Sequence, residues 1–239
     1  MGFDPDRERQ GLKSFGLKFH LETRYEDYLP DAVGNAAVMG LNAAVMALVL
    51  RMDEPGMRLV WKMRDWLEDA IQRDERFGKF PEFAAAQRYE AYGLTLWLTE
   101  ETWATDIYAL ALDRYDRLFA QPDQSNPDRI RDGAAAAYLR DAALANAGAR
   151  GLDLLKRIGG ARNDALLATA ADFCRSGVRT PEADHIIGAH LDDDWFGRGS
   201  NIQGALWLKA LLLVPGRTTG SRDTLAAASA LMEQARTQP

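Results

Sequence analysis

Apolar residues recur at helical spacing through most of the chain. Val60, Met63, Leu67 and Ile71 fall on one stripe of a helix, and charged residues occupy the positions between them. No comparable run alternates apolar and polar residues at every second position, and no Asn-Gly or Asp-Gly turn separates two β-branched runs. The pattern therefore predicts an all-α protein.

Prolines indicate where several of these helices begin. A proline in the first helical turn costs no hydrogen bond, and five of the nine prolines precede long segments rich in Ala, Leu and Met. These five are Pro30, Pro55, Pro81, Pro127 and Pro181. We expect helices over 31–52, 56–77, 81–98, 100–120, 127–147, 150–158, 163–176, 181–194, 200–214 and 221–236.

Short loops join the predicted helices, so we expect neighbours along the chain to pack as antiparallel hairpins. The prediction is a single domain over 31–239, built of about nine or ten helices stacked in the manner of an α-solenoid. Residues 1–30 are expected to pack on this domain. The side chains that would make the contact are Leu17, Phe19, Leu21, Tyr25 and Tyr28.

Residues 32–50 form the most apolar stretch of the chain, without a single charge, and approach the length that spans a membrane. The stretch consists mostly of Ala, Gly and Val with two asparagines inside it, which makes it weakly hydrophobic. Small residues recur four apart, at Ala36, Gly40 and Ala44, and suit the close approach of neighbouring helices. We interpret it as a central buried helix of the bundle and expect no membrane contact.

Composition favours a cytoplasmic protein with a protein partner. The single cysteine, Cys174, excludes an intramolecular disulfide, and the charged residues 1–10 do not resemble the start of a secretory signal. A formal net charge of −6 disfavours a nucleic acid as the partner and favours a basic protein. Many ordinary cytoplasmic proteins have a similar acidic balance.

Candidates for catalysis or metal binding are few. His185 and His190 are five residues apart, so they do not share one face of a helix. Glu182 and His185 form one Glu-x-x-His element, where a di-iron bundle uses two. Cys174 has no base near it in the sequence and is interpreted as a buried thiol. Since the chain also lacks nucleotide-binding and nucleophile-elbow motifs, we expect no enzyme, no metal and no cofactor.

An acidic and aromatic run near residue 195 is the strongest candidate for a functional surface. Carboxylates at a helix C-terminus oppose the helix dipole, which suggests that they serve another purpose. They suit the capture of a basic partner, because charge speeds the encounter and buried aromatic rings contribute affinity. A solvated loop between two helices explains the same residues. The candidate partner-binding residues are Glu182, Asp184, Asp192, Asp193, Asp194, Trp195 and Phe196.

A second charged face lies on and just after the predicted helix 56–77. Its basic residues are interleaved with acids, and Trp61 and Trp66 lie among them. Mixed charge of this kind is typical of a solvated helix face, which is how we interpret it. The basic residues are Arg58, Lys62, Arg73, Arg76 and Lys79.

Three segments carry a resemblance to a known family: Leu-Val-Trp-Lys at 59–62, Tyr-Glu-Ala-Tyr-Gly-Leu-Thr-Leu-Trp-Leu at 89–98, and the Ala-rich 132–147. Over residues 55–215 the chain resembles the all-helical immunity proteins encoded beside polymorphic toxins in bacteria, in particular the immunity-49 type. The resemblance implies no catalytic residues. It implies a protein that neutralises a cognate toxin by direct contact, by occluding its active site.

Two other functions stay open at the level of the sequence. One is a helical-repeat scaffold or regulator without a toxin partner. The other is a helical enzyme that holds a divalent metal on Asp192, Asp193 and Asp194. These acids are consecutive, whereas isoprenoid synthases use Asp-Asp-x-x-Asp, and no second such motif occurs in the chain.

Overall fold

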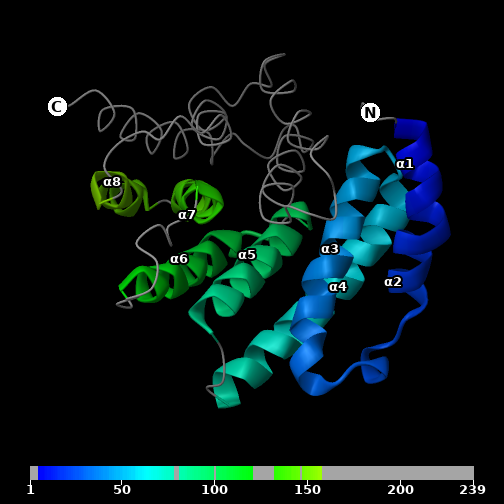
Figure 1. Cartoon of the computed structure of the whole chain (residues 1–239), viewed down its shortest axis with the longest axis horizontal. Coiled ribbons are helices and arrows are strands. Elements are labelled where there is room, and N and C mark those ends of the chain that lie inside the picture. Colours follow the sequence, from blue (N-terminus) through cyan, green and yellow to red (C-terminus); the bar gives the residue numbers. More distant parts are fainter. Residues whose placement is uncertain (1–4, 78–80, 100, 121–131, 146, 158–239) are drawn as a thin grey trace.

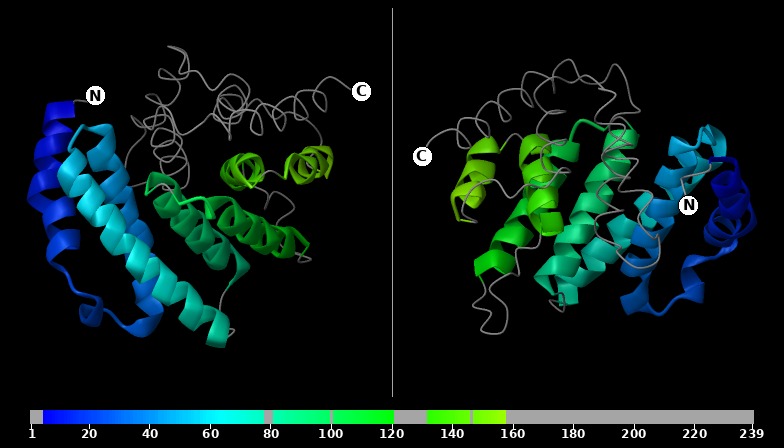
Figure 2. Two further views of the ribbon diagram at one scale, coloured as in Figure 1. Left: turned by 180° about the vertical axis from the view of Figure 1, so that it is seen from behind. Right: turned by 45° about the horizontal axis from the view of Figure 1, so that its top comes forward.

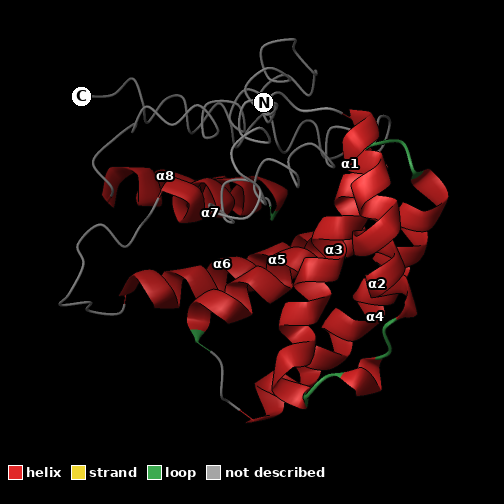
Figure 3. Ribbon diagram, turned by 45° about the vertical axis from the view of Figure 1, so that its right-hand side comes forward, coloured by secondary structure: helices red, strands yellow, loops and turns green. Residues whose placement is uncertain are grey.

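The computed structural model describes residues 5–77, 81–99, 101–120, 132–145 and 147–157. Every regular element within these ranges is helical, and no strand occurs among them (Figure 3). The predicted all-α class is therefore confirmed. The helices predicted at 163–176, 181–194, 200–214 and 221–236 lie outside the described residues.

The chain starts with short helical elements and continues with longer helices. The short ones are α1 (Pro5–Gly11), a π-helical turn (Leu12–Leu17), α2 (Lys18–Glu22) and two 3₁₀ turns (Tyr25–Asp27 and Pro30–Ala32). The longer ones are α3 (Val33–Val49), α4 (Asp53–Phe77), α5 (Glu82–Leu98), α6 (Ala104–Ala120), α7 (Asp132–Leu144) and α8 (Gly148–Arg157).

Consecutive helices pack against one another, as the short loops predicted. The pairs α3 with α4, α4 with α5 and α5 with α6 are antiparallel. Contacts continue from α6 to α7 and from α7 to α8. Figures 1 and 2 show the helices following one another across the molecule in chain order, from α1 and α2 on one side to α8 on the other. This is the predicted stack of helical hairpins.

Prolines mark three helix starts in the described part of the chain, as predicted. Pro30 opens the 3₁₀ turn that leads into α3, Pro55 lies in the first turn of α4, and Pro81 immediately precedes α5. The missing N–H is harmless at each of these places, because the first N–H groups of a helix have no partner within it.

The turn between α3 and α4 is closed by a non-glycine residue in the left-handed conformation. Arg51 has φ 61°, and its N–H donates to the Leu48 carbonyl at 3.1 Å. The N–H of Met52 donates to the Ala47 carbonyl at 2.8 Å. This is the Schellman pattern, in which glycine usually occupies the left-handed position. No glycine marks the turn, so the helix predicted over 31–52 extends past the true end of α3.

α3 is a core helix of the N-terminal half. Ala37 and Leu41 are fully buried, and a Cβ at Gly40 would overlap the sulfur of Met63 on α4. The segment Pro30–Val49 is long and apolar enough to cross a membrane, and 61% of its most apolar window is buried inside the protein. The interpretation of 32–50 as a central buried helix is confirmed, and the small residues permit the close approach of α4.

The apolar stripes of α4 and α6 differ in how completely they are covered. Val60, Met63 and Leu67 of α4 are fully buried, as the helical spacing predicted. α6 packs between α5 and α7 and buries Tyr108, Ala111 and Tyr115. Leu110 of the same helix is 42% exposed, so the apolar residues of α6 are only partly covered.

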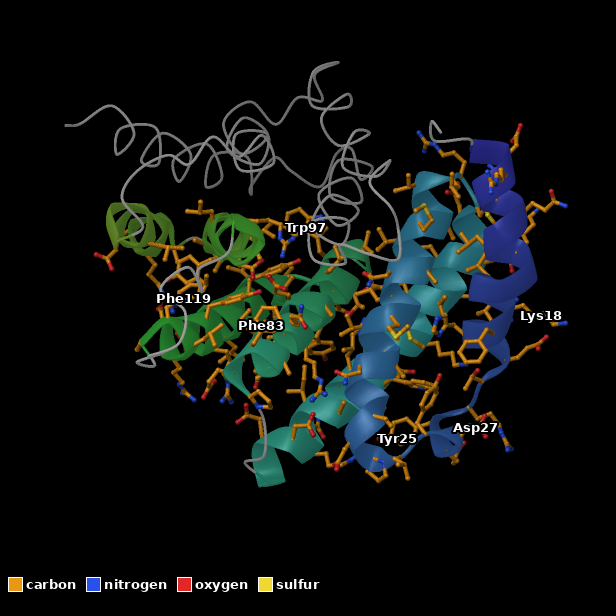
Figure 4. All side chains as sticks on the ribbon, viewed as in Figure 1. Lys18, Tyr25, Asp27, Phe83, Trp97 and Phe119 are labelled. Carbon is orange, nitrogen blue, oxygen red and sulfur yellow. The ribbon has the colours of Figure 1, made fainter. Side chains whose placement is uncertain are left out.

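The N-terminal segment packs on α4 through part of the set expected from the sequence. Leu17 is buried, and Tyr25 and Tyr28 meet the ring of Trp66 at centroid distances of 5.6 and 5.8 Å. Phe19 is 46% exposed, contrary to expectation, since it lies on the outer side of the short helix α2. Figure 4 shows Lys18 pointing away from the bundle, and Tyr25 and Asp27 in the segment that leads to α3.

Candidate functional site

The acidic run predicted to bind a partner lies outside the described residues. This applies to Glu182, Asp184, Asp192, Asp193, Asp194, Trp195 and Phe196, and also to Cys174, His185 and His190. Within the part of the chain that the structure describes, no group of three or more His, Cys, Asp or Glu side chains is arranged to hold a metal ion. A candidate site must therefore come from other residues.

The charged face of α4 is solvated only in part: the side chain of Arg58 is 66% exposed, as the mixed sequence suggested, whereas Lys62 is engaged by the N-terminal segment. Nζ of Lys62 donates to the carbonyl oxygens of His20 at 2.7 Å, of Leu21 at 3.0 Å and of Thr23. It also lies 5.0 Å from the centroid of the Trp66 ring, and Trp66 is only 8% exposed. The cation thus caps the end of α2 and holds the N-terminal segment on α4.

Trp61 differs from these neighbours because it stays on the surface. It is 48% exposed, and Trp103, just before α6, is 37% exposed. Arg64 connects the two. Its guanidinium carbon lies 5.0 Å from the centroid of Trp61, and its Nη1 donates to Oε1 of Glu101 at 3.1 Å. Oε2 of Glu101 accepts a hydrogen bond of 3.3 Å from the indole nitrogen of Trp103. We call Trp61, Arg64, Glu101 and Trp103 the tryptophan patch.

The tryptophan patch is supported by side chains beneath it. Arg64 also donates to the hydroxyl of Thr99 at 3.1 Å, and the ring of Trp103 meets that of Tyr92 edge-on at a centroid distance of 5.6 Å. Tyr92 is buried, and burial together with the charge of Glu68 raises its pKa to about 12. Because its side chains already hold defined positions, the patch would lose little conformational freedom on binding.

Acidic residues surround the tryptophan patch. Asp65 and Glu68 are exposed on α4, one and two turns after Trp61, and Asp106 is exposed in the first turn of α6. None of these three carboxylates forms an ion pair with another described residue. Arg64, the cation of the patch, is already paired with Glu101. The surface around the two tryptophans therefore has a net negative charge.

A polar depression lies between α4, α5 and α6, but its charges are engaged with one another. Arg88 pairs with Asp74, and Arg114 pairs with Glu75. The hydroxyl of Tyr89 donates to Oε1 of Glu75 at 2.8 Å. Burial raises the pKa of Asp74 against the opposing effect of Arg88. We interpret these contacts as a structural network that joins the three helices.

Comparison with known proteins identifies no relative: no protein-family model, no curated protein and no solved structure matches the chain. The resemblance to immunity proteins therefore stays a prediction from the sequence segments alone. Of the tryptophan patch, sequence reasoning found Trp61 on a charged helix face and missed Arg64, Glu101 and Trp103. A helix was predicted over 100–120, whereas α6 begins at Ala104, so Glu101 and Trp103 lie in the connection between α5 and α6. The Glu-x-Trp sequence at 101–103 was the signal available for them.

Proposed function

We propose that this protein binds a basic protein partner through the tryptophan patch, and that it acts as an immunity-type inhibitor that neutralises a toxin by direct contact. The observation that carries the proposal is the pair of exposed tryptophans bridged by the Arg64–Glu101 ion pair inside an acidic rim. Trp and Arg are the residue types that most often dominate the binding energy of an interface.

The acidic residues around the tryptophan patch, which we call the acidic rim, favour a partner with a basic surface. Asp65, Glu68 and Asp106 would attract lysine and arginine side chains over a distance of about a Debye length and so speed the encounter. Once the partner is in contact, burial of the two indole rings would supply most of the affinity. A partner bound to this face would have its own basic surface covered. If the toxin binds its substrate with that basic surface, covering it would inhibit the toxin.

The test begins with identification of the partner by co-purification of the tagged protein from its own host. Affinity for that partner is then measured for Trp61→Ala and Trp103→Ala by calorimetry. Each substitution is expected to cost about 2 kcal/mol or more, roughly a thirtyfold loss in Kd. Met39→Ala is the matched control, because Met39 is 63% exposed on α3 and lies outside the patch. Its effect on affinity should be negligible.

Two further measurements separate binding from inhibition. The triple variant Asp65→Asn, Glu68→Gln, Asp106→Asn should associate more slowly at low salt and like the unmodified protein at high salt. Co-expression should protect a host from the partner's toxicity, and Trp61→Ala should weaken this protection. Unchanged affinity of both tryptophan variants would show that the patch is not the binding surface. A partner that is harmless when expressed alone would disprove the inhibitor role.

A further inference from the structure

Three charged side chains are buried together where α7 meets α5. Glu90 of α5 is 2% exposed, and Arg140 and Asp141 of α7 are 7% and 0% exposed. Nη2 of Arg140 donates to Oε1 of Glu90 at 2.8 Å and to Oδ1 of Asp141 at 3.1 Å. Nε of Arg140 donates to the same Asp141 oxygen at 3.2 Å. We call these three residues the carboxyl latch.

The carboxyl latch contains two acids and one base. If both carboxyl groups were ionised, the cluster would hold one uncompensated negative charge in an environment closed to water, which is strongly unfavourable. Among the described residues, the other titratable groups that face it are the hydroxyls of Tyr108 and Tyr115 on α6, and burial raises the pKa of both well above the ordinary value. They stay neutral and cannot supply the missing positive charge.

The position of Asp141 shows where a proton would be held. Its Oδ1 accepts both bonds from Arg140, whereas its Oδ2 accepts no hydrogen bond from any residue that the structure describes. The carboxyl groups of Glu90 and Asp141 both accept from Nη2 of Arg140, so they lie close to each other around that nitrogen. Two carboxyl groups brought this close in a buried site do not both ionise readily, which favours a proton on one of them. Burial, reinforced by Glu90, raises the pKa of Asp141 well above its ordinary value, and Arg140 opposes this only in part.

We propose that Asp141, buried beside Glu90, keeps its proton at neutral pH, that this proton holds α7 on α5, and that its removal at alkaline pH releases α7 and α8. This proposal is independent of the tryptophan patch. A carboxyl group with a raised pKa in the folded protein takes up a proton on folding. Its contribution to stability is complete below the pKa of the unfolded chain and is lost as the pH rises through the folded value. The latch should therefore weaken toward alkaline pH.

Infrared spectroscopy of the unmodified protein tests the proton directly. The carbonyl stretch of a protonated carboxyl group should be present at neutral pH, disappear as the pH rises, and be absent at neutral pH from Asp141→Asn. Methyl NMR signals follow the consequence: those of Leu154 in α8 should lose their native positions over the same pH range, while those of Leu41 in α3 keep theirs. Absence of the infrared band at neutral pH would overturn the assignment of a proton to Asp141. A band that titrates without movement of the Leu154 signals would overturn the release.

Amide substitutions give a second, charge-counting test. Asp141→Asn and Glu90→Gln each leave one carboxylate for Arg140, so neither variant should take up a proton at this site on folding. The melting temperature of each should therefore fall less than that of the unmodified protein as the pH rises. The double variant removes both of the carboxylates that the structure shows around Arg140 and should melt far below either single variant. Asp116→Asn is the control, because Asp116 binds Arg150 and Tyr138 at a partly exposed site. This substitution should not change how far the melting temperature falls as the pH becomes alkaline. A double variant that melts like the singles would contradict the proposal.

Discussion

The contact of α3 with α4 and the contact of α7 with α5 are both buried, but they are built from different chemistry. α3 and α4 meet through small and apolar residues, with Gly40 against Met63 and with Leu41 fully enclosed. α7 meets α5 through Glu90 and the pair Arg140 and Asp141. The first contact depends on volume and the second on charge. Burial alone therefore does not tell how a helix contact responds to mutation or pH.

The largest expected effect comes from removing the cation of the charged contact. Arg140→Leu leaves Glu90 and Asp141 buried without a counter-charge and should cost about 3–5 kcal/mol in urea unfolding. Uptake of a proton at low pH removes the remaining buried negative charge, so the loss of stability should shrink as the pH falls. Arg150→Leu is the control, because Arg150 pairs with acids at a site where it is 32% exposed. If the loss of stability in Arg140→Leu does not change with pH, the contact of α7 with α5 does not differ from that of α3 with α4 in the way we propose.

A cavity in the apolar contact should cost nearly as much but should not respond to pH. Leu41→Ala removes a fully buried side chain between α3 and its neighbours and should cost about 2–5 kcal/mol. Urea unfolding at mildly acidic and mildly alkaline pH measures the effect. The loss of stability should be the same at both pH values, because Leu41 lies in a cluster of buried hydrophobic side chains. A strong pH dependence would show that the two contacts are coupled.

The N-terminal segment offers an intermediate case, in which a cation binds backbone carbonyls. Lys62→Met keeps the length of the side chain and loses the hydrogen bonds to His20, Leu21 and Thr23. The expected cost is about 1–2 kcal/mol, together with faster amide exchange at the end of α2. Arg58→Met, at a 66% exposed side chain on the same helix, should change stability by less than about 0.5 kcal/mol. Equal effects of the two variants would contradict the capping role.

The smallest expected effect is a gain in stability at the end of α3. Arg51 is held at φ 61°, a conformation that is unfavourable for a residue with a side chain. Arg51→Gly relieves this and should stabilise the protein by about 0.5–1 kcal/mol in thermal unfolding. Arg51→Ala, which keeps a Cβ, serves as the control and should give no gain. A loss of stability in Arg51→Gly would indicate that the arginine side chain makes a contact that stabilises the protein.

Local features of the sequence predicted much of the fold. Proline positions and helical spacing located the starts of α4 and α5 and the buried stripe of Val60, Met63 and Leu67. They misplaced the end of α3, because the hydrogen bonds that close it involve Arg51, a residue that carries no turn signal. They also assigned Lys62 to solvent, although it lies under a segment about forty positions earlier in the chain.

The candidate site was less accessible to sequence reasoning than the fold. The periodicity of α4 places Trp61 and Trp66 on charged turns and does not distinguish them, yet Trp66 is buried under Tyr25 and Tyr28 while Trp61 is exposed. The difference depends on where the N-terminal segment crosses the helix. No spacing within the helix encodes that crossing.

The sequence by itself determined that the chain is helical, where most of the described helices begin, and that the stretch around α3 is buried. The tertiary structure alone decided which polar residues meet, because an ion pair such as Glu90 with Arg140 joins positions 50 residues apart. Helix formation depends on neighbours three and four residues away, which a single pass along the chain reveals. Contacts between helices depend on their packing, and the burial of a charge follows from that packing.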